Sequence, residues 1–586
     1  MSYTISTEQR AFIRRLATEP LFLFMHLPAL ESAVVRKVRN KVVLALAGPH
    51  RGRKIWPQWL VAAEHAGASQ PAVSPPVNLP TYPCRMRERV NDSMDISEVR
   101  SADVDHEDYL ARHRWGFLLE QMLGNGVDWR ACLRACTQWT MTMSDTADPA
   151  WEPYSACERV ANLAVFLAAM PAPMREHGIP REMIEFIDRS LTWVYGHLEY
   201  YGPTETNNHI LNNARAFVLG GIVGGNPSAV SRGMQIFRRC LPEMIQSGGF
   251  LRERSSHYQL VVLNWVLDAW RFVAAAEGPD ADDARFLAGF AERMRTAASM
   301  LCERGGSLSA VIGDVSPDIT PARALDRLAL LYSDWWPHTY CSEGFAAADG
   351  WFRLSKGDEM ILGNFPEGRF PCDFPTHGHS DHTSFVWSHA GQEILVDPGR
   401  HRYSADEVSA AQVSAVSHNL PTVNGLSPLC ESMRRGGWWP VPYASAELRA
   451  TALTDGIVME HDGFARATPV SRHSRRIELR DCGLQVIDSF QGSGPVDLSF
   501  YWHFGEAFRN FDSSRMLAIG DGGNVRLDIS GTTAEGDRNR LQVELLPGCI
   551  SAEYGRMAPS IRLRVRCSVR LPVTIATQFS WVAGAS

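Results

Sequence analysis

Histidines and aspartates that can bind a metal or transfer protons are concentrated in one short stretch of the chain. His377, His379, Asp381 and His382 fall within the string HGHSDH, and a further Asp and His follow in LVDPG and VSHNL. Two His and one Asp on neighbouring strands are a ligand set that Zn²⁺ accepts, with three protein ligands. The plainer interpretation is a solvated turn that is rich in His.

A second polar group opens a helical pattern in TETNNHILNNARA, residues 204–216. Four Asn and His209 stand within seven residues, which is a costly composition for a helix. Asn208, Asn212 and Arg215 are spaced i, i+4 and i+7 and would share one helical face. The pattern indicates neutral donors that line a polar pocket. The alternative is a cluster that only caps the helix.

A third group is GGFLRERSSHYQ, residues 248–259, directly before a strongly apolar helical segment. It contains Arg252, Arg254 and Tyr258. A tyrosine beside arginines can have the pKa of its phenol lowered, which would make it a usable base. The alternative is that one of the two serines caps the following helix and the charged residues are incidental.

Two different hydrophobic periods indicate which elements must position these groups. From about residue 105 to about 335, apolar residues recur at i, i+3, i+4 and i+7, which predicts about eight to ten helices. From about 345 to the end, the period changes to two between Gly, Asp and Pro turns, which predicts an antiparallel β-sandwich. Sequential helical hairpins close as a toroid or stack as a solenoid. We expect a cleft between the two parts.

We expect three regions, at residues 1–100, 101–340 and 341–586. The first contains a basic, helical start, with ten Lys or Arg and three Glu in residues 1–60, and a Pro- and Ser-rich linker at 69–84. A basic start could touch an anionic lipid or polymer, or it could be the solvated face of short helices.

Composition excludes several classes of protein. The chain has 586 residues, a formal net charge of −7 and a pI near 6.3, so a general nucleic-acid binder is not expected. The 12 Cys are scattered and form no CxxC, so neither a disulfide scaffold nor a Cys-rich zinc module is indicated. The most apolar early run is too short to span a membrane, and no clear secretion signal precedes it. We therefore expect a cytoplasmic location, with the periplasm as the alternative.

Several separate segments resemble the heparinase II/III-like polysaccharide lyases, a group that includes heparin- and alginate-lyase types. The resemblance covers residues 100–580 and follows the order of the motifs in that family. The segments are WEPYSACERVANL, TNNHILNNARAFVLGG, GGFLRERSSHYQ, HGHSDHTSFVWSHAGQEILVDPGRHRY with SHNLPTVNG, and SAEYGRMAPSIRLRVRCSVRLPVTIATQFSW. It implies an α+β fold in which an N-terminal (α/α) toroid precedes a C-terminal β-sandwich.

The resemblance also implies roles for individual residues. Asn208 and His209 would bind and neutralise the carboxylate of a substrate uronate. Tyr258 would be the base or acid near the sugar ring, and His377 would be the other proton-transfer group. These four are the expected catalytic residues.

The expected metal is one zinc ion with a structural role. The resemblance implies that His379, Asp397 and His418 hold it. For the substrate, we expect contacts from the polar helix, the arginines before the apolar helix and a loop of the β-region. The residues expected there are Asn212, Arg215, Arg252, Arg254 and Tyr403, with Arg400 as a further contact.

The first hypothesis for function is a carbon–oxygen lyase that cleaves a 4-linked uronic-acid glycan, such as a glycosaminoglycan, by β-elimination. A glycosidase would instead need two facing carboxylates, and these three clusters contain no such pair. One alternative is a non-lytic protein that binds an anionic exopolysaccharide. Another is a di-zinc hydrolase, because HGHSDH also fits the H-x-H-x-D-H motif of the metallo-β-lactamase-like proteins. The sequence leaves open whether the chain forms homo-oligomers.

Overall fold

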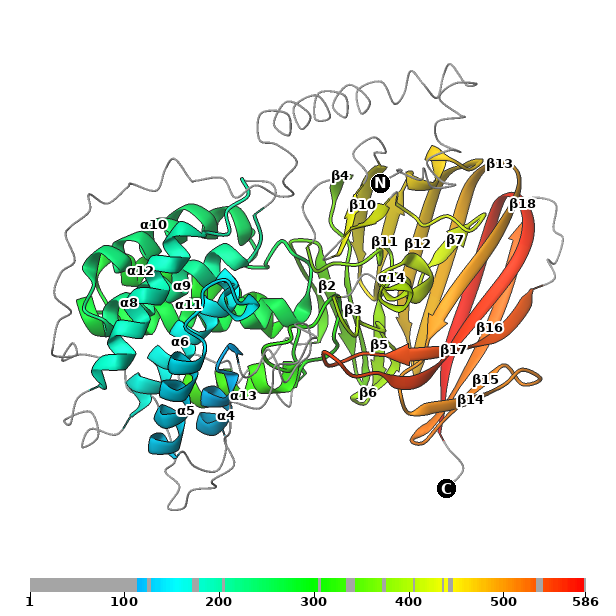
Figure 1. Ribbon diagram of the computed structural model, residues 1–586. Helices are drawn as coiled ribbons and strands as arrows, with labels where there is room; N and C mark the ends of the chain where they lie inside the picture. Colours follow the sequence, from blue (N-terminus) through cyan, green and yellow to red (C-terminus); the bar gives the residue numbers. More distant parts are fainter. Residues whose placement is uncertain are drawn as a thin grey trace.

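Helices occupy the first half of the structure and strands the second half (Figure 1). The computed structural model describes residues 113–583 except 124–127, 171–178, 203–205, 304–306, 334–342, 371–375, 404–405, 430, 435–436, 441–445 and 534–540. The α-helices described before the strands are α4 (Gly116–Leu123), α5 (Trp129–Thr142), α6 (Pro153–Ala169), α8 (Arg181–Gly196), α9 (His209–Val223), α10 (Pro227–Met244), α11 (Ser256–Glu277), α12 (Asp282–Ser299) and α13 (Pro321–Leu331). A 3₁₀ turn, η1 (Pro149–Trp151), precedes α6.

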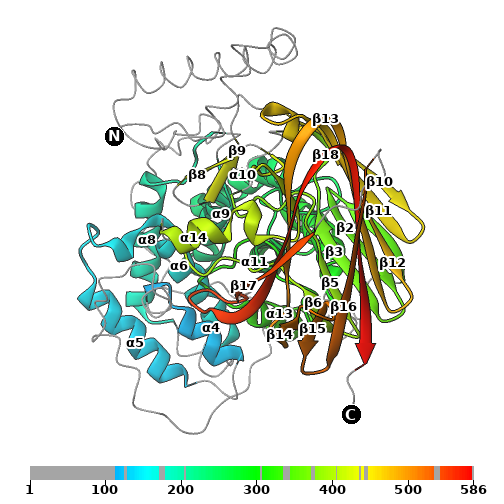
Figure 2. The same ribbon diagram turned by 90° about the vertical axis from the view of Figure 1, so that its right-hand side faces the viewer.

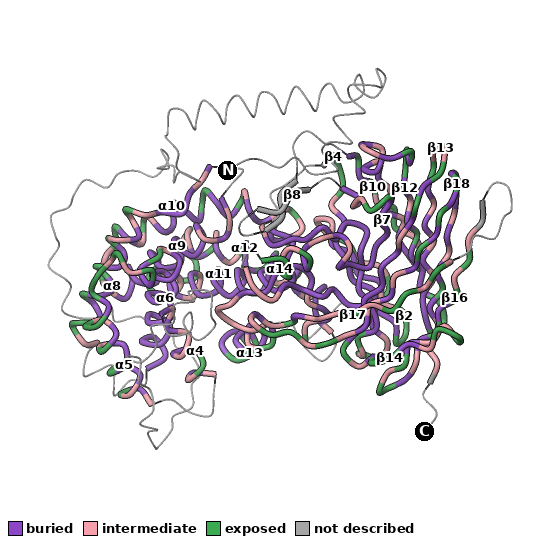
Figure 3. Tube along the Cα trace, turned by 45° about the vertical axis from the view of Figure 1, so that its right-hand side comes forward, coloured by how far each residue is buried: buried purple, intermediate pink, exposed green. Residues whose placement is uncertain are grey.

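Helix α9 lies at the centre of the helical half. Every residue from Ile210 to Val223 is buried, and the helix packs against α6, α8, α10 and α11. The outer helices α8 and α10 instead bury one face and expose polar residues on the other, as amphipathic surface helices do. The difference can be followed in Figure 3, where the tube of the inner helices is coloured as buried. A helix buried on all sides gives the polar residues at its N-terminus a fixed position.

The strands are β1 (Gly344–Ala348), β2 (Trp351–Lys356), β3 (Glu359–Asn364), β4 (Gly368–Phe370), β5 (Val386–His389), β6 (Gln392–Leu395), β7 (Pro421–Val423), β8 (Glu431–Arg434), β9 (Gly437–Pro440), β10 (Ala446–Leu453), β11 (Gly456–His461), β12 (Val470–Arg480), β13 (Gly483–His503), β14 (Phe508–Asp512), β15 (Leu517–Gly520), β16 (Gly523–Thr533), β17 (Gln542–Ile550) and β18 (Ala558–Ala583). Helix α14 (Glu407–Gln412) and the 3₁₀ turns η2 (Ala415–Ser417) and η3 (Gly463–Arg466) interrupt them.

The paired strands of the described chain are antiparallel. One sheet has the order β1-β2-β3-β5-β6, and a larger one has the order β14-β15-β16-β18-β13-β12-β11-β10-β4, with β17 paired to β18 and β7 to β13. Strands β8 and β9 form a separate hairpin. Figure 2 shows the two longest strands, β13 and β18, side by side. Along β18, buried Leu563 and Val565 alternate with more exposed arginines, which is the period of two expected for a strand with one buried face.

The two large sheets share one hydrophobic core. Trp387 of the smaller sheet and Phe579 of the larger one are both buried there, with ring centroids 6.0 Å apart. The order of a helical region followed by an antiparallel β-region is confirmed. Closure of the helices into a toroid and of the sheets into a sandwich stay predictions, as do the exact domain boundaries.

A further hydrophobic cluster joins the helical half to the strands. Phe250 stacks on Trp351 of β2, with ring centroids 5.3 Å apart, and Leu301 and Ile312 pack into the same cluster. The residues just before α11 are therefore held against the β-region by apolar packing as well as by polar contacts.

The basic start and the Pro- and Ser-rich linker lie outside the described residues, so their predicted structures stay predictions. Among the helices described, none combines the length and the apolar character needed to cross a membrane.

Candidate functional site

The candidate site lies where three distant segments meet. The backbone N–H of His377 donates to the carbonyl of Glu253 (3.3 Å), and the carbonyl of His377 accepts from the N–H of Asp314 (2.9 Å). These backbone hydrogen bonds fix the positions of the three segments relative to one another, and so the positions of their side chains in the site. The segments are 253–258, 312–316 and 377–379.

Gly313 permits this close approach. Its φ is +78°, and a Cβ at this position would lie 2.6 Å from the carbonyl oxygen of His377 and 2.8 Å from that of Arg254. Only glycine fits between two backbones at that separation without forcing one of them away. The middle segment is therefore tied to both of its neighbours.

Asn208, immediately before α9, contacts side chains from two of these three segments. Its Nδ2 donates to Oε2 of Glu253 (2.6 Å) and lies 3.1 Å from Nε2 of His377. Since an amide nitrogen has only hydrogens to offer, Nε2 of His377 accepts and its ring proton resides on Nδ1. All three side chains are buried. The helical half and the β-half thus meet through a direct hydrogen bond between Asn208 and His377.

Asp314 links two histidines. Its Oδ2 accepts from Nδ1 of His377 (3.2 Å) and its Oδ1 from Nε2 of His379 (2.9 Å). Burial alone would raise the pKa of Asp314, but Arg400, whose Nη1 is 3.6 Å away, and the two histidines hold this pKa below its usual value. An ionised Asp314 fixes the tautomer of both rings.

Tyr258, in the first turn of α11, lies against the same histidine. Its ring stacks on His377, with centroids 3.7 Å apart, and its hydroxyl is 2.7 Å from that of Tyr403. The Tyr403 hydroxyl donates to the carbonyl of Val315 (2.7 Å), so Tyr258 is the donor to Tyr403. Burial raises the pKa of Tyr258 well above its usual value. The predicted lowering of this pKa by arginines is wrong, because burial dominates and the Arg254 guanidinium is bonded to Asn364 and Asp381 instead.

His209, the first residue of α9, is the more accessible part of the site. Its Nδ1 donates to Oε1 of Glu199 (2.7 Å), and 32% of its side chain is exposed. Burial acts to lower the pKa of His209, but the charge and hydrogen bond of Glu199 outweigh it and raise this pKa. A positive charge is therefore favoured at an accessible position beside Asn208.

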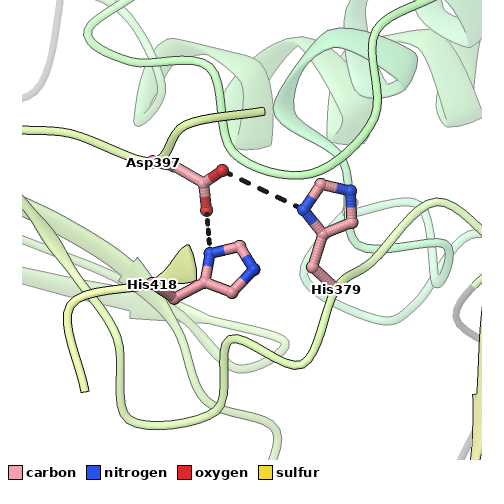
Figure 4. A group of neighbouring side chains, drawn as sticks. All are labelled: His379, Asp397 and His418. Atoms are coloured by element: carbon pink, nitrogen blue, oxygen red, sulfur yellow. Dashed lines mark hydrogen bonds and ion pairs between the residues drawn. The ribbon is translucent and has the colours of Figure 1, made fainter. Parts of the chain in front are cut away.

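His379, Asp397 and His418 come together as the sequence predicts, and Figure 4 shows the three side chains facing one another. One ligand atom of each lies within 4.8 Å of the others. Nδ1 of His418 is 3.1 Å from Oδ2 of Asp397, and Nδ1 of His379 is 4.0 Å from Oδ1. Burial opposes ionisation of Asp397, yet His418 holds its pKa below the usual value.

Two observations make this group suitable for a metal ion. Nδ1 of His379 and Nε2 of His418 are buried and have no hydrogen-bond partner. His379 also donates its other nitrogen to Asp314, which is the outer-shell arrangement that orients a metal-binding histidine. The donor set of two imidazoles and one carboxylate is the kind that zinc accepts.

Residues 344–582 match the family model described as "Heparinase II/III-like, C-terminal". This range contains His377, Tyr403 and the group of three metal-binding candidates. The C-terminal part of the chain is therefore similar to the heparinase II/III-like proteins.

Solved structures show that the fold extends beyond the matched range. A crystal structure of heparinase III has a TM-score of 0.61 at 10% identity and covers 85% of this chain and 80% of its own. A second heparinase III has a TM-score of 0.53 at 14% identity, covering 82% and 75%. Heparan sulfate lyase HepC from Pedobacter heparinus has a TM-score of 0.50 at 15% identity, covering 84% and 79%. At these identities the likeness concerns the fold alone, and it extends over both halves of the chain. A comparison with curated protein sequences gave no match.

Two of the expected substrate contacts lie in the core of the helical half. The Arg215 side chain is fully buried and forms ion pairs with Glu158 and Asp268, each at 3.0 Å. Asn212 is also fully buried and faces the carbonyl of Tyr154. Both assignments are corrected: because α9 is buried on every side, its polar face turns toward the core beyond Asn208 and His209.

The two arginines before α11 hold the structure together. Arg252 donates to the carbonyl of Thr206 (2.6 Å) and supports the approach to α9. Arg254 is buried and donates to Asp381 (2.9 Å) across the boundary between the halves. The assignment of Arg254 as a substrate contact is corrected as well, whereas that of Arg252, which is half-buried, stays a prediction. Tyr403 does lie at the site, against Tyr258.

The metallohydrolase interpretation is also corrected. A di-zinc site would need Asp381 and His382 as ligands, but both are bonded to Arg254, Asp381 through Oδ1 and His382 through Nε2 at 2.9 Å. The Arg254 guanidinium therefore occupies the space of a second metal ion and already compensates the negative charge of Asp381.

Glu253 and Asp314 are site residues that the sequence interpretation missed. Glu253 stands within the string RERSS, in which the sequence interpretation assigned roles only to the two arginines. Asp314 lies 63 residues from His377 and in no recognised motif. The alternative interpretation, that one of the two serines caps the following helix, is confirmed for Ser255, since its Oγ accepts from the N–H of Tyr258 (3.0 Å).

Proposed function

We propose that the protein is a polysaccharide lyase that cleaves a 4-linked uronic-acid glycan by β-elimination. The supporting observation is the contact between Asn208 of the helical half and His377 of the β-half, with Tyr258 stacked on the same imidazole. The side chains to which we assign the carboxylate-binding, proton-accepting and proton-donating roles are thus adjacent. The partner is therefore an anionic poly- or oligosaccharide.

The carboxylate of the uronate must be neutralised before its C5 proton can be removed. Both Nδ2 hydrogens of Asn208 are bonded in the free protein, to Glu253 and to His377, so Asn208 would bind the carboxylate by turning the second of them from His377 to the substrate. His209 supplies positive charge, which Glu199 favours. Donors that point at the carboxylate stabilise the enolate-like charge of the transition state, by about 3–4 kcal/mol for a single well-placed group.

Two proton transfers are needed, and we assign one to His377 and the other to Tyr258. Nε2 of His377 is assigned as the base that takes the C5 proton, while Asp314 holds the ring through Nδ1. The Nε2 lone pair accepts from Asn208 in the free protein and becomes available when that hydrogen turns to the substrate carboxylate. Tyr258, whose pKa is raised, keeps its proton and is assigned as the acid. The C5–H electrons form the C4=C5 double bond, the C4–O4 bond breaks, and O4 leaves with the proton from Tyr258.

We also propose one zinc ion on His379, Asp397 and His418. Bound there, zinc would supply a structural link rather than Lewis-acid chemistry. His379 would hold Asp314, and Asp314 in turn holds His377.

The test is ultraviolet absorbance from the conjugated C4=C5 product. Alginate, heparan, hyaluronan, chondroitin and bacterial exopolysaccharides are each incubated with the wild-type protein. Absorbance with at least one of them, and none with a neutral glucan, is the expected result. Binding of an anionic glycan with no absorbance on any member would favour a non-lytic role.

A further inference from the structure

Both oxygens of the Glu253 carboxylate are committed to one residue. Oε1 accepts from the backbone N–H of Asn208 and Oε2 from its Nδ2, each at 2.6 Å. Asn208 precedes α9 without making the side-chain bond that usually caps a helix, and Glu253 supplies an acceptor there instead. Negative charge is favoured at that end of a helix. Glu253 is fully buried, so its carboxylate cannot turn toward water.

This arrangement decides which way the Asn208 amide points. The oxygen and nitrogen ends of an asparagine amide are almost identical in shape, so only their hydrogen-bond partners distinguish the two orientations. Both oxygens of the Glu253 carboxylate accept from Asn208, and this selects the orientation with Nδ2 toward Glu253 and His377. Oδ1 is left without a partner, which is the cost of holding the donor end in the site.

Glu253 also holds the segment of His377 in the β-half. The backbone carbonyl of Glu253 accepts from the N–H of His377 (3.3 Å). Its side chain thus fixes Asn208 in the helical half, while its backbone fixes His377 in the β-half. The distance from Oε2 to Nε2 of His377 is 3.7 Å, so the carboxylate lies beside the pair without occupying the hydrogen bond between them.

We propose that Glu253 is a positioning residue that sets the orientation of the Asn208 amide for the substrate carboxylate. This inference rests on the proposed lyase function. Glu253 does not touch substrate; it acts through Asn208.

The first test is a double-mutant cycle. Glu253→Gln keeps the shape but offers a competing amide, so kcat is expected to fall about 10- to 100-fold while KM changes little. In an Asn208→Ala background the same change should have almost no further effect, because residues that act through one another are not additive. Equal losses in both backgrounds would overturn the proposal.

Glu359→Gln is the matched control. Glu359 is likewise buried and accepts two side-chain bonds, from Trp387 (2.6 Å) and His389 (2.9 Å), but it lies at the start of β3 and contacts none of the site residues described above. We expect it to lower stability and leave kcat per folded molecule unchanged. A comparable fall in kcat in both variants would show that the effect of Glu253 is only structural.

A second test needs no turnover. Hydrogen exchange of the backbone amide of Asn208 should be faster in Glu253→Leu than in wild type and unchanged in Glu359→Leu, because leucine offers no acceptor and only the first variant removes the acceptor of that N–H. If wild type forms no unsaturated product on any uronate, the proposed function fails, and this measurement still decides whether Glu253 holds Asn208. Unchanged exchange in Glu253→Leu would overturn the inference.

Discussion

The phenol ring of Tyr258 lies parallel to the imidazole of His377, with 3.7 Å between centroids and 4° between planes. One ring belongs to the first turn of α11 and the other to the loop before β5, so the stack spans the two halves of the protein. The stack depends on the ring, whereas the bond to Tyr403 depends on the hydroxyl. The packing of the Tyr258 ring and the chemistry of its hydroxyl can therefore be tested separately.

Tyr258→Phe keeps the ring and removes the hydroxyl. We expect the melting temperature to change little, because the stack on His377 and the packing of α11 remain. Turnover should fall by at least about 10²-fold with KM nearly unchanged, since the acid for the leaving oxygen is lost. Steady-state kinetics from product absorbance check this. Wild-type turnover in the variant would remove Tyr258 from the mechanism.

His379→Ala is expected to lose the metal ion. Protein purified without chelators should contain one zinc per chain by elemental analysis, and the variant should contain none and melt at a lower temperature. His382→Ala is the control, because His382 is equally buried in the same loop but bonds Arg254 instead. Loss of zinc in both variants, or no metal in wild type, would contradict the assignment of the three ligands.

His209 should make stability depend on pH. Burial opposes its charge, but Glu199 raises its pKa above the unfolded value of 6.5. The protonated pair therefore stabilises the fold fully below about pH 6.5, and this contribution disappears as pH rises through the folded pKa. Urea unfolding of wild type and His209→Gln at a series of pH values should show a difference that shrinks with rising pH. KM should rise over the same range, and a difference independent of pH would exclude a charged His209.

Local patterns predicted the two kinds of secondary structure because each follows from burial of one face. The alternation of Leu563 and Val565 with arginines is enough to identify a strand. It does not reveal that β18 pairs with β13, β16 and β17, since those partners are distant in sequence and strand pairing depends on the whole sheet. The order of strands in the large sheet was therefore beyond prediction from periodicity.

The site was predicted where a short motif carried it and missed where it depended on the fold. Asn208 and Tyr258 lie in recognisable strings and meet at the site. Arg215 was misplaced, because a helix buried on all sides gives no sign of which polar residue faces a core acid such as Asp268. Asp314 reaches the site through Gly313 and a close backbone contact, for which an isolated aspartate in the sequence gives no signal.

Gly313→Ala should disturb the site through the backbone alone. Gly278 provides the control: its φ is +99°, and a Cβ there would meet nothing within 4 Å. Alanine at Gly278 therefore measures only the backbone strain, about 1–3 kcal/mol. Alanine at Gly313 adds an overlap with the carbonyl oxygens of His377 and Arg254, which must move and carry Asp314 with them. We expect a larger loss of unfolding free energy in Gly313→Ala, measured in urea, together with a lower kcat that Gly278→Ala does not show. Equal losses and equal kcat in the two variants would mean that the backbone contact at Gly313 does not set the position of His377.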